Sequence, residues 1–181
     1  MRLFIAINFT DHMKDDLDMM VNNLKKQSER GTFTRKENLH LTLAFLGEVS
    51  KEEVTTLVDV MKHSVIPSFP LTISEFGKFR IQRESLYWCG VKMTEPLANL
   101  QSKLLYVLKN ARFTPDDKPF KPHITLGRRC RMKDSFSENE FQISLPEMVM
   151  QVEKISLMKS ERVNGILTYT EIADVRLLDN F

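Results

Sequence analysis

The sequence has little of what marks several large classes of protein. Among its 181 residues only Cys89 and Cys130 are cysteines, and they lie far apart and outside any Cys-x-x-Cys pair. A disulfide framework would need more cysteines than this. We therefore expect reduced thiols and a reducing, cytoplasmic compartment.

An excess of charge of one sign and long apolar runs are also lacking. The 26 basic and 24 acidic residues leave a formal net charge of +2. That charge is too small for a protein that wraps duplex nucleic acid, but it allows a small basic pocket. No apolar run approaches the roughly 20 residues that cross a bilayer, and residues 1–9 lack the long apolar core and cleavage site of a signal peptide. We expect a soluble protein with no membrane partner.

The chain does have enough apolar residues, 42% of the total, to bury the core of one domain. Alternating and helical spacings predict strands over about 2–9, 71–79, 85–93, 149–158 and 166–177, and helices that begin after Thr10, Ser50 and Thr94. Gly31 is expected to follow the first helix, and residues 32–38 to form a polar connection. Asn164-Gly165 predicts a hairpin turn. Strands joined by hairpins or single helices predict an α+β fold with mainly antiparallel sheets.

Two short stretches share one pattern. His40-Leu41-Thr42-Leu43 and His123-Ile124-Thr125-Leu126 each place a threonine two residues after a histidine, with aliphatic residues at the alternate positions. In a strand, residues i and i+2 share a face, so each histidine lies beside its threonine while the aliphatic side chains point into a core. One such stretch is ordinary for a half-buried strand. Two copies, which use half of the four histidines in the chain, favour a functional pair.

Histidine has an ordinary pKa near 6.5, so it can hold or release a proton at neutral pH. Two histidines across a cleft can divide acid and base catalysis, each role being worth about 10²–10⁴-fold in rate. The threonine hydroxyls can donate hydrogen bonds to phosphate oxygens, so the four side chains suit a phosphodiester. No cofactor or metal is required, because the chain has no His-Glu-x-x-His and no evident third ligand. It also lacks the Gly-x-Ser-x-Gly of a serine nucleophile.

One motif falls in each half of the chain, each time in a strand that comes after a helix. This coarse repeat predicts two related sheets that face each other across a central cleft, with helices outside and a pseudo-twofold relation between the halves. No linker rich in Gly, Pro or Ser separates them, so residues 1–181 are expected to form a single bilobal domain. We expect a monomer, because the cleft forms within one chain.

The motifs resemble those of a known family. The first is followed by Phe45-Leu46-Gly47, and the second reads Pro122-His123-Ile124-Thr125-Leu126-Gly127-Arg128. Paired His-x-Thr signatures of this kind resemble the 2H phosphoesterase superfamily, and most closely the bacterial RNA 2′,3′-cyclic phosphodiesterases, also called 2′-5′ RNA ligase-like proteins. Comparable residues also occur over 2–7, 88–91 and 160–169, so the likeness runs the length of the chain.

The resemblance implies a hydrolase of RNA processing that converts terminal RNA 2′,3′-cyclic phosphates to 2′-phosphomonoesters without a metal. Carried over by position, His40 is the proton donor to the departing 3′ oxygen, and His123 is the proton acceptor that activates water. Thr42 and Thr125 hold the phosphate. The division of acid and base roles comes from the family and not from the spacing. The implied substrates are RNA 3′ ends or small nucleoside cyclic phosphates.

Arg128 is a further candidate for a phosphate contact. In an unbroken strand it lies five residues from His123 and its side chain faces the opposite way, so this assignment depends on a bulge. Candidates for stacking on a base are Phe33, Trp88, Phe120 and Tyr169. For each of these aromatic residues alone, core packing is the commoner role.

Other functions stay open at this stage. A related 2H enzyme could act on another cyclic phosphate, such as ADP-ribose 1″,2″-cyclic phosphate, or on a 2′-5′ linkage. Some members of the family join RNA through 2′-5′ linkages, which is related chemistry in reverse. The chain could also be an RNA-end binding module without turnover, although the two intact motifs argue against this.

Overall fold

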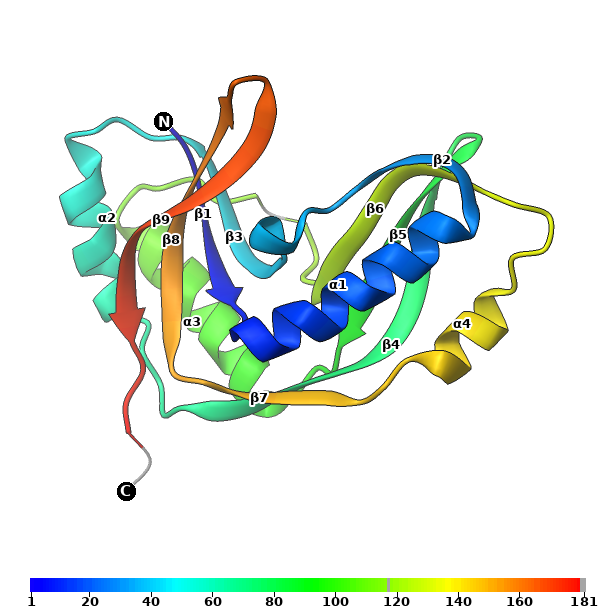
Figure 1. The fold of residues 1–181 in the computed structure, drawn as a ribbon. Helices are drawn as coiled ribbons and strands as arrows, with labels where there is room; N and C mark the ends of the chain where they lie inside the picture. The colour runs from blue at the N-terminus through cyan, green and yellow to red at the C-terminus, as the bar shows by residue number, and fades with distance from the viewer. Residues whose placement is uncertain (117, 180–181) are drawn as a thin grey trace.

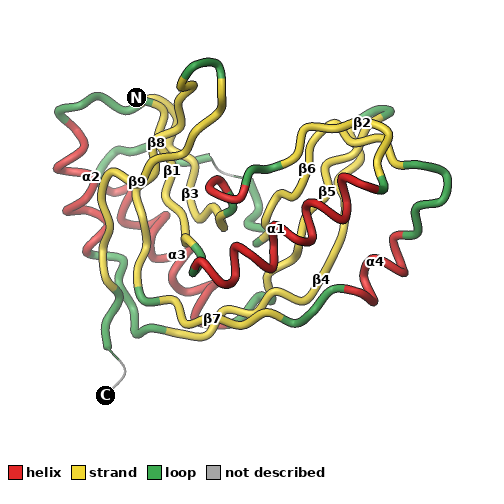
Figure 2. Tube along the Cα trace, in the orientation of Figure 1, coloured by secondary structure: helices red, strands yellow, loops and turns green. Residues whose placement is uncertain are grey.

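The computed structural model describes residues 1–116 and 118–179, and it contains two antiparallel sheets (Figures 1 and 2). The first sheet has the order β3-β1-β8-β9, with strands at His40–Glu48, Arg2–Asn8, Lys154–Val163 and Ile166–Arg176. The second has the order β2-β6-β5-β4-β7, with strands at Ser28–Phe33, His123–Met132, Glu84–Val91, Phe69–Ile81 and Met148–Val152. The predicted α+β fold with mainly antiparallel sheets is confirmed.

The two long helices each cross from one half of the molecule to the other. α1, at Asp11–Lys26, follows β1 of the first sheet but packs on β2 and β6 of the second. α3, at Glu95–Asn110, follows β5 of the second sheet but contacts β3 of the first, beside α2 at Glu53–Lys62. Buried residues of both sheets belong to one hydrophobic cluster. One hydrophobic core therefore joins the two sheets.

Local sequence signals form as predicted at several boundaries. The Thr10 hydroxyl caps α1 by accepting a hydrogen bond from the backbone N–H of Met13 at 3.3 Å. Before α2, the Ser50 N–H donates to the Glu53 carboxylate, and the Glu53 N–H donates to the Ser50 hydroxyl. At the tip of the β8–β9 hairpin, Asn164 and Gly165 have φ values of 50° and 79°. Positive φ at both central residues is what a tight hairpin turn requires.

The sequence prediction is wrong at three places. Residues 149–158, expected to form one strand, belong to two: β7 ends at Val152 in the second sheet and β8 begins at Lys154 in the first. Residues 28–33 form strand β2, where Gly31 was expected to follow a helix and residues 32–38 to form a polar connection. β2 is an edge strand that pairs only with β6 and is largely exposed, so it lacks the alternation of a half-buried strand. The seven-residue helix α4, at Glu138–Ser144, was not predicted. It buries only Phe141 against the core, and a helix this short shows no apolar period.

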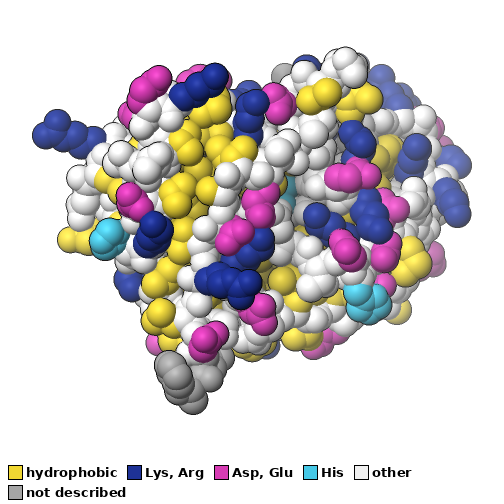
Figure 3. Space-filling view, turned by 60° about the vertical axis from the view of Figure 1, so that its left-hand side comes forward, with side chains coloured by type: hydrophobic (Ala, Val, Ile, Leu, Met, Phe, Trp, Pro, Cys, Tyr) yellow, Lys and Arg dark blue, Asp and Glu magenta, His cyan; other side chains and the backbone are white. Residues whose placement is uncertain are grey.

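The surface shows no dominant charge. In Figure 3, Lys and Arg side chains are interspersed with Asp and Glu on the face in view, in keeping with the formal net charge of +2. Among the described residues, no helix is both long and apolar enough to cross a membrane. Cys89 and Cys130 are free and buried. Burial raises the pKa of the Cys89 thiol to about 12, so this group is an inert part of the core.

Candidate active site

The two His-x-Thr motifs lie on strands that meet between the sheets. β3 is an edge strand of the first sheet, and it contacts β6 of the second. On both strands the histidine and threonine are partly exposed, and the aliphatic residue between them is buried, as predicted. The charge of His123 lowers the pKa of His40, so the two rings lie within electrostatic range. The structure thus brings the two predicted motifs together in one site.

Each motif strand carries a β-bulge directly after its threonine. In β1, Ala6 pairs with Thr42, but its neighbour Ile5 pairs with Ala44. Leu43 is therefore the extra residue of β3. In β5, neighbouring residues pair with Thr125 and with Gly127, so Leu126 is the extra residue of β6. The two halves therefore share a backbone irregularity as well as a sequence motif, as a pseudo-twofold relation between them predicts.

The bulge in β6 decides the position of Arg128. Five residues separate it from His123, so an unbroken strand would point the two side chains to opposite faces. The extra residue reverses the alternation, and the Arg128 guanidinium lies 3.5 Å from the Thr125 hydroxyl oxygen. Its charge also lowers the pKa of His40 on the opposite strand. Arg128 therefore brings a positive charge to the face that carries both motifs.

His40 is held at both ring nitrogens. Its Nδ1 lies 2.7 Å from the Asn38 carbonyl oxygen, and its Nε2 lies 2.9 Å from the Thr42 hydroxyl oxygen. Because a carbonyl oxygen can only accept, Nδ1 carries a hydrogen and donates it. In the neutral ring, Nε2 accordingly accepts a hydrogen bond from the Thr42 hydroxyl. Nε2 is the atom at which this ring can take up or release a proton.

Asn38 fixes the carbonyl that orients His40. It is buried at the end of the short 3-10 helix η1, at Lys36–Asn38. Its side-chain amide donates to the Leu167 carbonyl at 2.9 Å and accepts from the Tyr169 N–H at 3.1 Å. Both partners belong to β9, so the β8–β9 hairpin supports the orientation of the imidazole. Sequence reasoning missed Asn38, whose only local signal is its place two residues before a histidine.

Aromatic rings enclose His40. The ring centroids of Phe4 and Tyr169 lie 4.8 and 5.1 Å from that of the imidazole. Phe45, which occupies the position of β3 that corresponds to Arg128 in β6, stacks on Phe4. This burial is the main cause that lowers the pKa of His40 to about 4, and nearby positive charges lower it further. In the free protein, His40 is therefore neutral at pH 7.

His123 is held in the same way but has different surroundings. Its Nδ1 lies 2.7 Å from the carbonyl oxygen of Lys121, again two residues earlier in the chain. Its Nε2 is therefore also the atom left for proton exchange. The ring centroids of Phe79 and Trp88 lie 5.4 and 6.4 Å from that of its imidazole. His123 also lines a cavity of about 350 Å³.

Comparison with known proteins places this site in a family. Residues 13–164 match the 2′-5′ RNA ligase superfamily. The chain belongs to that superfamily. An RNA 2′,3′-cyclic phosphodiesterase of Thermotoga maritima is 32% identical over 163 residues, which cover 88% of this chain and 87% of the relative. Another, from Methanothermobacter thermautotrophicus, is 28% identical over 182 residues, covering 97% and 98%.

A solved structure agrees with this result. The crystal structure of E. coli LigT complexed with 3′-AMP matches this superfamily member with a TM-score of 0.79 at 26% identity, and 97% of each chain is covered. The predicted family resemblance and the predicted two-sheet fold are both confirmed.

The four aromatic candidates for base stacking have different surroundings in this 2′-5′ RNA ligase superfamily member. Trp88 and Phe120 line the cavity beside His123. Tyr169 presents its edge to the other histidine. Phe33 packs against the main hydrophobic core, which is the commoner role weighed for it. Phe33 also pairs with Gly127 at the end of the second motif. All four candidates thus lie near the motifs, and two of them, Trp88 and Phe120, line the cavity.

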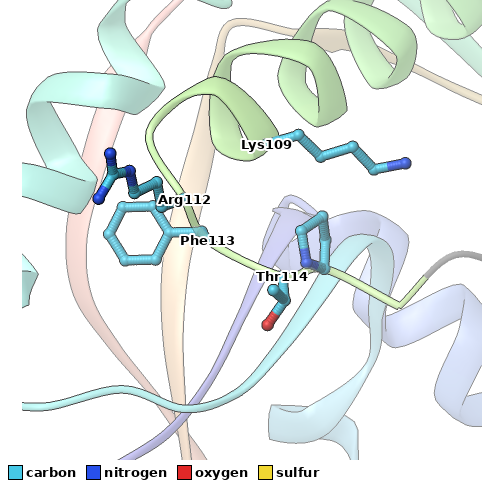
Figure 4. Close-up of a pocket in the computed structure, with 5 residues that line it drawn as sticks. Lys109, Arg112, Phe113 and Thr114 are labelled. Carbon is cyan, nitrogen blue, oxygen red and sulfur yellow. The ribbon is translucent and has the colours of Figure 1, made fainter.

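A second cavity of the superfamily member lies at the C-terminal end of α3. It has a volume of about 450 Å³ and is lined by Lys109, Arg112, Phe113, Thr114 and Pro115 (Figure 4). None of the predicted site residues lines it, so it is separate from the motifs. Within residues 1–116 and 118–179, no group of three or more His, Cys, Asp or Glu side chains is placed to hold a metal ion.

Proposed function

We propose that this chain hydrolyses terminal RNA 2′,3′-cyclic phosphates to 2′-phosphomonoesters, with His40 and His123 as its acid and base and without a metal ion. The observation that supports this best is the matched pair of imidazoles. Each has Nδ1 held by the carbonyl two residues earlier, and each thereby presents Nε2 for proton transfer. Two such groups suit a displacement at phosphorus that needs a base and an acid. The names of the relatives point to the same substrate class.

In the proposed reaction, Nε2 of His123 accepts a proton from water as the water oxygen bonds to phosphorus. The bond between phosphorus and the 3′ oxygen breaks, and Nε2 of His40 donates a proton to that oxygen. The products are a 3′-hydroxyl and a 2′-phosphomonoester. Proton exchange with solvent then restores both rings. This assignment of donor and acceptor follows the family resemblance.

A donor role for His40 requires the bound phosphate to favour its protonated form. The ring is neutral at pH 7 in the free protein because its pKa is about 4. An anionic phosphodiester beside the ring raises that pKa by stabilising the imidazolium. Protonated Nε2 no longer accepts from the Thr42 hydroxyl, whose oxygen lies 2.9 Å away. The threonine hydrogen can then turn toward the phosphate, and the Nε2–H is available to the departing 3′ oxygen. Phosphate binding and protonation of His40 therefore reinforce each other.

Thr125 and Arg128 are proposed to hold the phosphate from the opposite strand. The Arg128 Nη2 and the Thr125 oxygen are 3.5 Å apart, so both can reach oxygens of a single phosphate. Together with Thr42, they would surround the phosphorus with donors from both sheets. Such fixed donors stabilise the charge that develops on the phosphate oxygens during the displacement.

The substrates that fit this proposal are RNA 3′ ends or small nucleoside cyclic phosphates, with no cofactor. All of the proposed site residues come from one chain, which supports action as a monomer. The free, buried cysteines support a cytoplasmic location.

The test is incubation of an oligoribonucleotide that ends in a 2′,3′-cyclic phosphate, in the presence of EDTA, with separation of 2′- from 3′-phosphate products. Wild type is expected to yield only the 2′-phosphate. His40→Ala and His123→Ala should each lose at least about 100-fold in rate. His63→Ala, at an exposed histidine of α2's C-terminal end, is the matched control and should keep full activity.

Each contrary outcome has its own meaning. If wild type binds the RNA but does not hydrolyse it, the protein is an RNA-end binding module and not this enzyme. Hydrolysis that survives either histidine variant would contradict the acid and base pair. Loss of wild-type activity in EDTA would contradict the metal-free mechanism.

A further inference from the structure

A gap in the second sheet lies directly beside His123. In the register of β4, β5 and β6, Gly90 pairs with His123 on one side and with Glu75 on the other. These three residues thus form one row across the cleft face. Strands two apart are separated by about 10 Å, and Gly90 has no side chain to fill the space between its neighbours. A slot therefore opens over the backbone of Gly90, with an imidazole at one side and a carboxylate at the other.

The walls of this slot are aromatic. Trp88 lies two residues before Gly90 on the same face of β5. Its indole covers Gly77 so closely that a Cβ there would lie 2.4 Å from it. Phe79 packs on Trp88 with ring centroids 5.3 Å apart, and the Lys121 ammonium lies 5.9 Å from the Phe79 ring. Together with the residues of the central row, these side chains line the cavity of about 350 Å³. That volume lies in the range that holds small organic ligands.

The carboxylate of the slot has no partner among the described residues. The Glu75 side chain leans over Gly90, because a Cβ on the glycine would lie 3.0 Å from its Oε2. Glu75 is exposed and takes part in no hydrogen bond or ion pair with the described residues. The Trp88 indole turns its Cζ3 edge toward Gly90, so the face of the slot beside the glycine is apolar ring. The Glu75 carboxylate is therefore the group here that can accept hydrogen bonds from a ligand.

We propose that this slot, formed by Glu75, Phe79, Trp88, Gly90, Lys121 and His123, binds a nucleobase and selects guanine through the Glu75 carboxylate. Guanine presents adjacent N1–H and N2–H donors that a carboxylate accepts in pairs, and its O6 is an acceptor for a nearby N–H. Adenine and cytosine offer only an amino group, and uracil offers a single imino hydrogen. The aromatic rings supply a stacking surface for any base. The expected order is guanine first, adenine and cytosine next, and uracil last.

The base can come from either of two nucleosides, and this proposal rests on the proposed phosphodiesterase function for both. One is the nucleoside that carries the cyclic phosphate. The other is a nucleoside on the far side of the phosphorus, joined through its 5′ oxygen as in a 2′-5′ linkage. His123 is the proposed base, so the slot lies on the side from which a 5′-hydroxyl would approach.

Binding measurements test the proposal without turnover. Guanosine and uridine 2′-phosphates are titrated calorimetrically into wild type, Glu75→Gln and Glu147→Gln. Glu147 is an exposed glutamate next to β7 and is the matched control. Wild type and Glu147→Gln are expected to bind the guanosine compound about tenfold more tightly than the uridine compound, the discrimination typical of a paired base contact. Glu75→Gln should reduce this ratio below about twofold, chiefly by weakening guanosine binding.

A second arm distinguishes the two nucleosides. The same three proteins are titrated with 2′-5′-linked dinucleotides that carry adenosine before the phosphate and guanosine or uridine after it. Guanine preference confined to the mononucleotides places the terminal base in the slot, and preference confined to the dinucleotides places the following base there. Both results support the proposal if the preference depends on Glu75. It is overturned if neither arm shows guanine preference, or if Glu75→Gln retains it.

The two proposals fail separately. Guanine preference that depends on Glu75, in a protein that hydrolyses no cyclic phosphate, would overturn the hydrolytic function and leave the base site. Hydrolysis of cyclic phosphate ends by a protein that shows no guanine preference in either binding arm would overturn the base site and leave the hydrolytic function.

Discussion

Protonation of His40 should destabilise the ligand-free protein as the pH falls below neutral. The pKa of this ring is about 4 in the folded chain and near 6.5 in an unfolded one. Between these values the unfolded chain binds a proton at His40 that the folded chain does not bind, so stability increases with pH. It is lost as the pH falls through this window. A difference of about 2.5 units at 1.36 kcal/mol per unit gives a loss of about 3 kcal/mol by pH 4.

Urea unfolding of paired variants isolates this contribution. The free energy of unfolding is measured from pH 7.5 to pH 4 for wild type and His40→Gln, which removes the titrating group. Other ionisable groups cancel in the difference between the two proteins when they are independent of this site. The difference should change by about 3 kcal/mol across the window. His63→Gln, at an exposed histidine, is the matched control. Parallel curves for wild type and His40→Gln would refute the argument from burial.

A bound anion should move the same pKa in the opposite direction. Inorganic phosphate in the site would stabilise the imidazolium, so the pKa of His40 measured by NMR titration should rise from about 4 when phosphate is added. The effect should be absent in a chloride control at equal ionic strength, since general screening acts in both. An unchanged pKa at saturating phosphate would mean that the anion does not bind beside this ring.

Two further substitutions give separable results. Arg128→Gln removes a positive charge that lowers the pKa of His40, so this pKa should rise in NMR titrations. The matched control is Arg129→Gln, which should leave the pKa unchanged because the Arg129 side chain contacts β2. Equal effects of the two substitutions would contradict the placement of Arg128. Asn38→Ala removes both side-chain hydrogen bonds to β9 and leaves their backbone partners unpaired. The free energy of unfolding in urea should therefore fall by about 2 kcal/mol. A fall of less than about 0.5 kcal/mol would contradict the anchoring role of Asn38.

The parts of the fold that sequence predicts well are those decided within a few residues. A cap such as Thr10 and a turn such as Asn164-Gly165 act on their own neighbours, so the start of α1 and the turn of the β8–β9 hairpin follow directly from the chain. The alternating burial of His40-Leu41-Thr42 is equally local, because it needs only a strand with one face in the core. The motif pair and the strands that carry it could therefore be inferred from the sequence alone.

What sequence does not predict depends on partners far away in the chain. β2 exists because β6 offers it hydrogen bonds, and its own residues carry little apolar pattern. Nothing in the residue types around Leu126 indicates a bulge, so the sequence predicts the direction of the Arg128 side chain only on the condition that a bulge is present. Glu75 becomes a neighbour of His123 through the register of three strands, which no single stretch encodes.

The two motifs are alike in sequence, in their bulges and in the carbonyl that holds each Nδ1, so their roles must differ through their surroundings. His40 meets Phe4 and Tyr169, and Phe45 stands where β6 has Arg128. If His40 is the donor, the reactive form of the free protein has a protonated His40 and a neutral His123. Because the pKa of His40 is about 4, only a small fraction of molecules has this form at pH 7. Exchanging the two roles would give the same bell-shaped pH profile, because the profile reports the pair and not either residue. The roles can therefore be separated only by titrating each ring with phosphate bound, and the donor is the ring that then keeps its proton to the higher pH.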